Sequence, residues 1–352
     1  MFSSEAAKFL GVRYGVLTNS GSSAGLLALS ALELPKGSEV IISAVTFPTI
    51  FNIILQCGLV PVVVDAKVGT YGFDVADVEK AITKKTKAII AINIVGNPID
   101  TPKIRELISK QDHKIWLLSD NCDGFGTTIK GKSVESYADV SFTSFHAAHI
   151  VSMGVGGAVF TDNTELEKNV RMYRDWGRQA NTNEPNKYES LPPDYNPRFI
   201  YEKIGYNFQI LELQAAMGRV QLRKINKIKK IRKSNFDYIT KKLAKYDDII
   251  LPKIIDDADV CWFAVPLTYK LDRGPLVAHL EKNGIETRSM FAGTILAHPA
   301  FANSVYKIGP NGLNEANYIL KHSFFISCHP SLTKDDMDYM IKVFETYLDE
   351  KD

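Results

Sequence analysis

The sequence has few cysteines and no apolar run long enough to cross a bilayer. Its cysteines, Cys57, Cys122, Cys261 and Cys328, are scattered, without a C-x-x-C pair or another metal-ligand spacing. We therefore expect reduced, partly buried thiols and no metal site. Residues 1–5 lack the basic start and apolar stretch of a signal peptide. The protein is expected to be cytoplasmic, with no membrane partner.

An excess of one charge is also lacking. Lys and Arg number 42 and Asp and Glu 40, so the net charge at pH 7 is +2. This balance gives no electrostatic case for a nucleic-acid partner. Basic residues gather at 223–233, where isoleucines recur every three residues. That spacing predicts an amphipathic helix whose basic face is solvated.

The chain has 352 residues, more than one core usually organises. Short runs rich in Val and Ile alternate with helical segments in its first half. These runs are 40–43, 60–64, 88–92 and 115–119. The alternation predicts an α/β fold with a mostly parallel sheet covered on both faces. We expect a large α/β domain at 1–240, with a long helical region from 210 to 246 across its end. A smaller α+β domain is expected at 241–352, with a strand at 260–266.

Ligands of such sheets lie at the carboxyl ends of the strands. A Gly/Ser turn, residues 19–25, separates an expected strand at 14–18 from an apolar helix at 26–32. The turn suits a phosphate, because the first N–H groups of a helix are unpaired. An ordinary helix cap by Ser20 or Ser22 is the equally weighted alternative.

Two further strand ends carry informative side chains. Asp120 follows an apolar run directly, and a buried carboxylate needs a cationic partner. No Lys or Arg adjoins it in sequence, so a ligand cation would serve. Phe47 ends another strand, where it would offer a flat face for stacking or act as a core aromatic.

The stretch 144–157, SFHAAHIVSMGVGG, links the end of one apolar run to the start of another. It carries two imidazoles, His146 and His149, in a turn with a Gly-rich exit. By themselves they are either satisfied, partly buried histidines or groups that face a ligand.

Five motifs occur in one order along the chain. They are residues 19–24, Phe47 in VTFP, Asp120 in SDNCD, the stretch 144–157, and residues 205–216. In that order the sequence resembles the DegT/StrS-type pyridoxal-phosphate sugar aminotransferases, from about residue 4 to about 345. These are fold-type I enzymes that act on nucleotide-linked keto sugars.

The resemblance implies a cofactor role for several residues. Gly21 and Ser22 would bind the phosphate of pyridoxal phosphate (PLP), with Ser144 adding a hydroxyl. Phe47 would stack on the ring, and Asp120 would pair with the protonated ring nitrogen. Asp123 stands where relatives often have Gln or His near the ring hydroxyl.

The resemblance also implies a homodimer with shared active sites, in which Asn207 reaches the phosphate of the neighbouring subunit. His146 would support the site. Arg288 and His298 would meet the nucleotide or the sugar.

One position departs from the aminotransferase pattern. His149 stands where those enzymes have the lysine that tethers the cofactor, and imidazole has no primary amine. The same replacement marks the nucleotide-4-keto-6-deoxysugar 3-dehydratases. They use pyridoxamine phosphate (PMP) to remove the sugar's 3-hydroxyl. His149 would take a proton from the cofactor's C4′ carbon and help to protonate the departing hydroxyl. Glutamate is the expected amino donor that restores PMP.

One set of these dehydratases acts on GDP-sugars. The other acts on CDP- or TDP-sugars and carries an iron–sulfur cluster with a reductase partner. Stretches 96–98, 174–178, 191–195 and 291–293 resemble the second set. Residues 179–197 nevertheless contain no cysteine, and a cluster needs three or four thiolates. We therefore predict that no iron–sulfur cluster is present.

Three hypotheses follow for a nucleotide-sugar protein of this type. The favoured one is a 3-dehydratase. The second is an aminotransferase that works without the lysine, and the third is a degenerate partner subunit. The nucleotide, the stereochemistry of the sugar and the need for a reductase stay open at this stage.

Overall fold

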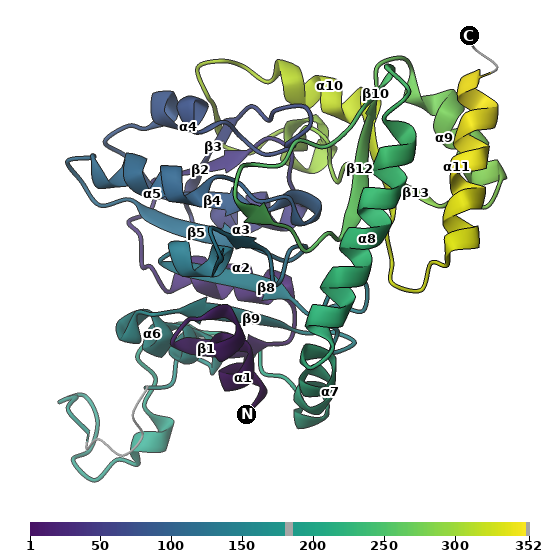
Figure 1. Ribbon diagram of the computed structural model, residues 1–352. Helices are drawn as coiled ribbons and strands as arrows, with labels where there is room; N and C mark the ends of the chain where they lie inside the picture. The colour runs from purple at the N-terminus through teal and green to yellow at the C-terminus, as the bar shows by residue number, and fades with distance from the viewer. Residues whose placement is uncertain (180–185, 350–352) are drawn as a thin grey trace.

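The computed structural model describes residues 1–179 and 186–349. Its centre is an eight-stranded sheet in the order β1-β9-β8-β5-β4-β2-β3-β14 (Figure 1). The strands are β1 Tyr14–Thr18, β2 Glu39–Ser43, β3 Val60–Val64, β4 Thr86–Ile92, β5 Trp116–Asp120, β8 Val140–Ser144, β9 Gly157–Thr161 and β14 Lys307–Ile308. All neighbours pair in parallel except β9, which is antiparallel to both β1 and β8. The mostly parallel sheet predicted from the sequence is confirmed.

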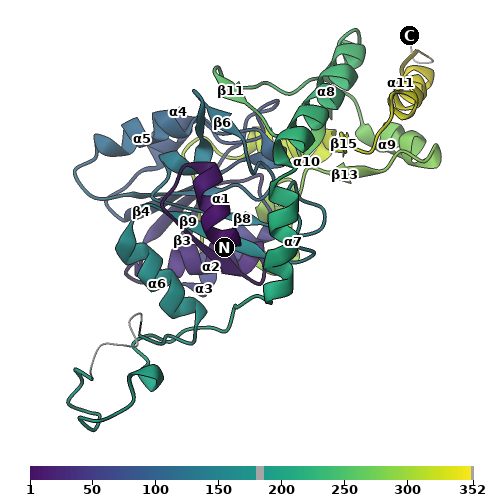
Figure 2. The same cartoon turned by 60° about the horizontal axis from the view of Figure 1, so that its bottom comes forward.

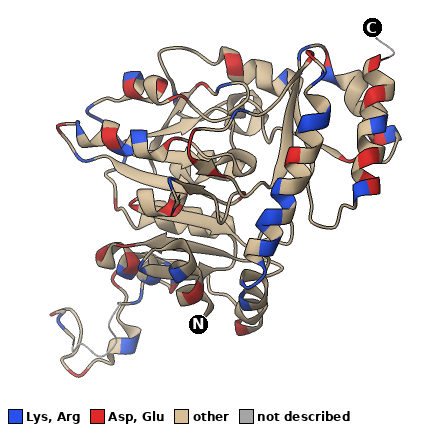
Figure 3. Cartoon of the chain, in the orientation of Figure 1, with Lys and Arg blue, Asp and Glu red and all other residues tan. Residues whose placement is uncertain are grey.

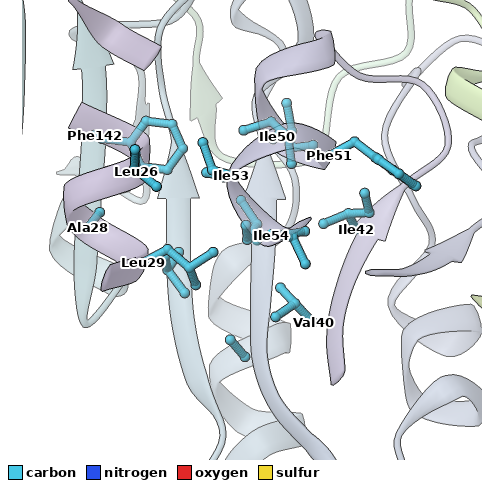
Figure 4. Close-up of a cluster of buried hydrophobic side chains, with 14 of the residues drawn as sticks. Leu26, Ala28, Leu29, Val40, Ile42, Ile50, Phe51, Ile53, Ile54 and Phe142 are labelled. Atoms are coloured by element: carbon cyan, nitrogen blue, oxygen red, sulfur yellow. The ribbon is translucent and has the colours of Figure 1, made fainter. Parts of the chain in front are cut away.

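Helices cover both faces of this sheet because its central strands are apolar on both sides. Those of the first half are α1 Phe2–Leu10, α2 Gly21–Ser30, α3 Pro48–Gln56, α4 Val75–Ala81, α5 Thr101–Ser109 and α6 Thr164–Arg174. Along β2, Val40 and Ile42 pack with α2 and α3, whereas Ile41 packs with α4 and α5 on the other face. Figure 4 shows part of the first cluster, with side chains of α2 and α3 beside Val40 and Ile42.

A smaller antiparallel sheet has the order β10-β12-β15-β13. Its strands are β10 Ile249–Ile250, β12 Ala264–Tyr269, β13 Thr287–Ser289 and β15 Ser323–Ser327. It shares a separate core with α8 Ile225–Leu243, α9 Arg273–Lys282 and α11 Lys334–Asp349. These elements lie together on one side of the large sheet (Figures 1 and 2).

The remaining elements belong to neither of these sheets. They are α7 Glu212–Leu222, α10 Asn314–His322, β6 Thr128–Ile129, β7 Lys132–Ser133, β11 Ala258–Asp259, and the 3-10 turns η1 Ile94–Gly96, η2 Val134–Tyr137, η3 Pro197–Phe199, η4 Ile295–Ala297 and η5 Pro299–Phe301. Of these, β11, β6 and β7 pair with one another in a small third sheet. The boundary predicted at residue 240 falls inside α8. In the described ranges, no helix has the length and hydropathy that a bilayer span requires.

Three local predictions are wrong. The helix expected at 26–32 begins at Gly21, because the Ser20 hydroxyl oxygen caps it by accepting the Ser23 N–H. The helix expected from 210 to 246 is two helices, α7 and α8, separated at residues 223–224. The strand expected at 260–266 begins only at Ala264. The N–H groups of Cys261 and Phe263 instead bond to Thr127 and Val95 of the large domain.

Basic residues recur along α8 and in the turn before it (Figure 3). Ile225, Phe236 and Ile239 of α8 are buried, and most of its lysines are exposed. The amphipathic helix predicted at 223–233 is confirmed from Ile225 onward, but its basic face is only partly solvated. Arg232 is buried and donates to the Phe263 carbonyl, and Lys229 pairs with Asp259.

Candidate active site

A cavity of about 480 Å³ lies where the carboxyl ends of β4, β5 and β8 meet the N-termini of α2 and α3. The small sheet and the segment before it close one wall, through Phe263, Arg288, Phe291 and Phe325. Nine predicted site residues line the cavity: Gly21, Ser22, Phe47, Asp120, Asp123, Ser144, His146, His149 and Arg288. The folded chain thus brings together residues from distant parts of the sequence, from Gly21 at the start of α2 to Arg288 in β13.

The start of α2 forms a tight cradle. A Cβ atom on Gly21 would lie 2.6 Å from the Cβ of Ser144, and one on Gly157 would lie 2.4 Å from the Ser20 carbonyl oxygen. Only glycine allows these backbones to approach so closely. The Ser22 hydroxyl contacts Thr49 Oγ1 at 2.8 Å and so joins the starts of α2 and α3. The free N–H groups at the start of α2 suit a phosphate.

Phe47 precedes α3 and remains 56% exposed. Its ring meets Phe291 edge-on, with ring centroids 6.3 Å apart. The alternative of a core aromatic is therefore wrong, since most of this ring has no protein cover. An uncovered aromatic face at the edge of a cavity can stack on a flat ligand.

Asp120 is the last residue of β5 and is buried. Its Oδ1 accepts the Cys122 N–H at 3.0 Å. Burial raises the pKa of Asp120 above its usual range, and no Lys or Arg of the described ranges forms an ion pair with it. A cation supplied by a ligand would relieve this desolvation cost.

His149 lies in a hairpin loop, residues 145–156, between antiparallel β8 and β9. Ser144 pairs with Gly157 at the base of the loop, and the Phe145 N–H donates to the Gly156 carbonyl at 2.8 Å. At the tip of the loop, the His149 N–H donates a hydrogen bond of 3.0 Å to the His146 carbonyl, which closes a turn. These bonds direct the His149 side chain into the cavity, where it is 18% exposed, whereas His146 is exposed at the rim.

His149 and Asp123 both line the cavity and lie side by side, with 3.6 Å between His149 Nε2 and Asp123 Oδ1. Burial, aided by His146, lowers the pKa of His149 to about 4. Burial and the nearby Asp120 carboxylate raise the pKa of Asp123 to about 7. The imidazole is therefore neutral near pH 7. Sequence reasoning missed this pairing, because the residues are 26 positions apart in separate loops.

Two predicted site residues lie outside the cavity lining. The exposed His298 has its Nε2 2.8 Å from the Ala292 carbonyl oxygen. Asn207 is also exposed, and its backbone pairs with Asp175. The four cysteines are free thiols; Cys261 and Cys328 are buried, and Cys57 and Cys122 are half-buried.

Taken together, the lining fits one kind of ligand. It offers a phosphate cradle at α2, a stacking face at Phe47 and a buried carboxylate at Asp120 for a cationic ring nitrogen. These are the groups that a phosphorylated pyridine ring requires. A cavity of this size leaves room beside the ring for part of a second ligand.

Residues 1–345 match the DegT/DnrJ/EryC1/StrS aminotransferase family. The lipopolysaccharide biosynthesis protein RfbH of Salmonella typhimurium is 37% identical over 369 residues, covering 98% of this chain and 84% of the relative. The dTDP-4-dehydro-2,6-dideoxy-D-glucose 3-dehydratase of Saccharopolyspora spinosa is 36% identical over 363 residues, covering 97% and 78%.

The fold also matches a solved structure of GDP-4-keto-6-deoxymannose-3-dehydratase with a trapped PLP–glutamate geminal diamine. The TM-score is 0.90 at 28% identity, and the match covers 97% of this chain and 91% of that one. The expected fold type I of PLP-dependent enzymes is thereby confirmed.

Proposed function

The chain belongs to the DegT/DnrJ/EryC1/StrS aminotransferase family, and from that premise we propose that it is a PLP/PMP-dependent 3-dehydratase of a nucleotide-linked 4-keto-6-deoxyhexose. The observation that carries the proposal is the His149 imidazole at the cavity, at the position where the sequence resemblance implies the tethering lysine of the aminotransferases. Similarity to 3-dehydratases, in sequence and in fold, supports the same conclusion.

The chain's own residues would hold the cofactor. Gly21, Ser22 and Ser144 would bind its phosphate, Phe47 would cover one face of its ring, and Asp120 would hold the ring nitrogen protonated. When bound, PMP supplies the amine that joins the sugar's ketone and a ring that withdraws electrons. When PMP binds, its protonated ring nitrogen would supply the positive charge that the buried Asp120 carboxylate otherwise lacks.

His149 would be the acid/base group. Its low pKa keeps the imidazole neutral at neutral pH, so that its unprotonated ring nitrogen can accept a proton from the cofactor's C4′ carbon. The same nitrogen would then release that proton toward the hydroxyl leaving C3, which departs as water. Imidazole suits this exchange because one ring nitrogen can take a proton and return it.

Arg288 would meet the diphosphate of the nucleotide. It lies on β13, is exposed, and lines the cavity on the wall opposite α2. Its planar guanidinium suits the recognition of phosphate oxygens. Glutamate would restore the amine form of the cofactor.

We also propose a homodimer. Large apolar side chains are exposed on α7 and on the adjoining segments, namely Trp176, Phe199, Tyr201, Ile204, Leu211, Leu213, Met217 and Val220. Ile204 is 96% exposed and Leu213 is 72% exposed. Such a patch is unusual on a monomer and suits a self-complementary interface. Asn207 lies within this region, is exposed, and does not line the cavity of its own chain.

Product analysis tests the activity. The protein would be incubated with PMP, glutamate and a panel of GDP-, CDP-, TDP- and UDP-linked 4-keto-6-deoxyhexoses, and products would be followed by mass spectrometry. We expect loss of the C3 oxygen and formation of 2-oxoglutarate.

A stable amino sugar would instead show an aminotransferase. No turnover with any of these substrates would point to a partner subunit. Both outcomes would overturn the dehydratase proposal.

A further inference from the structure

Asp123 is held rigidly in front of His149. Its Oδ2 accepts the Val95 N–H at 3.1 Å, which leaves Oδ1 facing the imidazole. Val95 has a φ of +48°, a left-handed conformation that β-branched residues rarely adopt. The Val95 carbonyl accepts the Phe263 N–H at 3.0 Å, and the Phe263 ring lies 5.6 Å from the His149 ring. The turn at Val95 thus positions both Asp123 and Phe263, the two residues next to the His149 ring.

The two ring nitrogens of His149 have different surroundings. Nδ1 is buried without a hydrogen-bond partner among the described residues. Nε2 is the nitrogen that faces Asp123. Proton exchange at this imidazole is therefore an exchange at Nε2, next to the Asp123 carboxyl.

Five other titratable or charged groups surround the pair. Asp120 and Cys122 lie on the same segment as Asp123, His146 is in the hairpin loop, and Arg232 and Arg288 come from α8 and β13. Burial raises the pKa of the Cys122 thiol well above its usual range, so it stays neutral. Asp120 repels a second negative charge on Asp123, whereas Arg232 disfavours a positive charge on His149. Asp120 thus opposes the ionisation of Asp123, and Arg232 opposes the protonation of His149.

We infer that Asp123 is a positioning residue that acts through His149, and that its loss of a proton makes Nε2 an effective base. This inference rests on the proposed role of His149. When Asp123 is ionised, a proton taken by Nε2 gives an imidazolium next to a carboxylate, and the pair as a whole is neutral. When Asp123 is protonated, the same step leaves an uncompensated buried cation, which is costly. Nε2 then returns the proton to the departing hydroxyl, which becomes water, and Asp123 ends as it began.

Nuclear magnetic resonance of the cofactor-free protein tests the pair without any substrate. The protein would carry ¹⁵N-labelled histidine and His146→Gln, which removes the second imidazole of the loop. His149 signals would be assigned by their loss in His149→Asn. We expect them to shift with a midpoint near pH 7, as Asp123 ionises, while the ring itself stays neutral.

In the same background, Asp123→Asn should abolish this transition, and Asp123→Glu should restore one. Circular dichroism would verify that both variants fold. A transition that persists in Asp123→Asn, or its absence from the protein with Asp123 intact, would overturn the inference.

The pH dependence of turnover gives an independent readout. Turnover should rise to a plateau as Asp123 ionises, with a midpoint below that of the resonance transition, because the cationic ring nitrogen beside Asp120 would relieve the repulsion that raises the Asp123 pKa. In Asp123→Asn it should be flat between about pH 6 and 8 and at least about 10-fold lower. If the His149 signals shift near pH 7 but no dehydration product forms, the proposed function is wrong, whereas the pairing of Asp123 with His149 is supported. If dehydration occurs without the transition, the pairing fails alone.

Discussion

A single side chain separates two kinds of chemistry at the residue scale. The hairpin loop presents an imidazole at position 149, next to a carboxyl group and within a cavity that otherwise suits a phosphorylated pyridine. An amine at this position would bond to the cofactor, whereas the imidazole can only exchange a proton.

The variant His149→Lys tests this distinction. The introduced lysine should form a bond to PLP that borohydride traps, and dehydration should fall by about 100-fold or more. Mass spectrometry of the reduced protein detects the adduct, and product analysis measures the loss. His149→Asn is the matched control, because it removes the imidazole without adding an amine. Full dehydratase activity in the lysine variant would refute the role of His149.

The same two residues predict opposite pH effects on stability. The Asp123 pKa is higher in the folded state, so its stabilising contribution is complete below about pH 4 and is lost by about pH 7. The His149 pKa is lower in the folded state, so its destabilising contribution fades as the pH rises from about 4 to about 6.5. Each effect is worth on the order of 4 kcal/mol, and together they largely cancel.

Single variants should uncover both contributions. Urea unfolding of the cofactor-free protein would be measured between pH 4.5 and about 7.5. Asp123→Asn should become more stable as the pH rises, and His149→Asn should become less stable. Equal pH slopes in the two variants would contradict the assigned ionisation states.

At the scale of the element, the start of α2 depends on its close approach to β9. The Ser20 carbonyl leaves no room for a side chain at position 157. This packing fixes the free N–H groups of α2 where a phosphate would bind.

Gly157→Ala should therefore displace the Ser20–Gly21 backbone and weaken PLP binding by about 10-fold or more. Absorbance titration of the cofactor-free protein with PLP measures this affinity. Ala147→Ser, at an exposed position in the hairpin loop, should leave the affinity unchanged. Wild-type affinity in Gly157→Ala would show that the α2 cradle does not hold the phosphate.

The sequence predicted the elements that are fixed by local pattern. Apolar runs located β2 to β5, and the residues after them, including Asp120, are at the cavity. It did not predict that residues 260–263 would leave the sheet, because their N–H groups bond to Thr127 and Val95, which are distant in sequence. The Asp123–His149 pair depends on the relative placement of two loops, which no periodicity encodes.

At the scale of the whole molecule, nine of the predicted site residues line the cavity, but Asn207, the predicted phosphate contact of a neighbouring subunit, lies outside it. The exposed apolar residues of α7 adjoin the segment that carries Asn207. A two-fold dimer would bury this surface and allow each chain to complete its partner's site.

Mixing two inactive variants tests this arrangement. His149→Asn and Asn207→Ala should each be poorly active. An equal mixture, unfolded and refolded together, should recover about a quarter of wild-type activity, because half the dimers are mixed and each has one intact site. Separately refolded proteins, combined afterwards, serve as the control. Lack of recovery, despite mixed dimers seen by native mass spectrometry, would exclude the shared site.

The hairpin loop between β8 and β9 separates its structural residues from its reactive ones. Phe145, Ile150, Val151 and Met153 are buried in a core cluster with Phe2 and Phe125, whereas residues 146–148 are exposed and His149 lines the cavity. The tip of the loop can therefore change without loss of core packing, whereas its flanks cannot. Evolution and enzyme design thus have room to exchange the reactive side chain while the flanks of the loop keep it aimed at an inherited cofactor cradle.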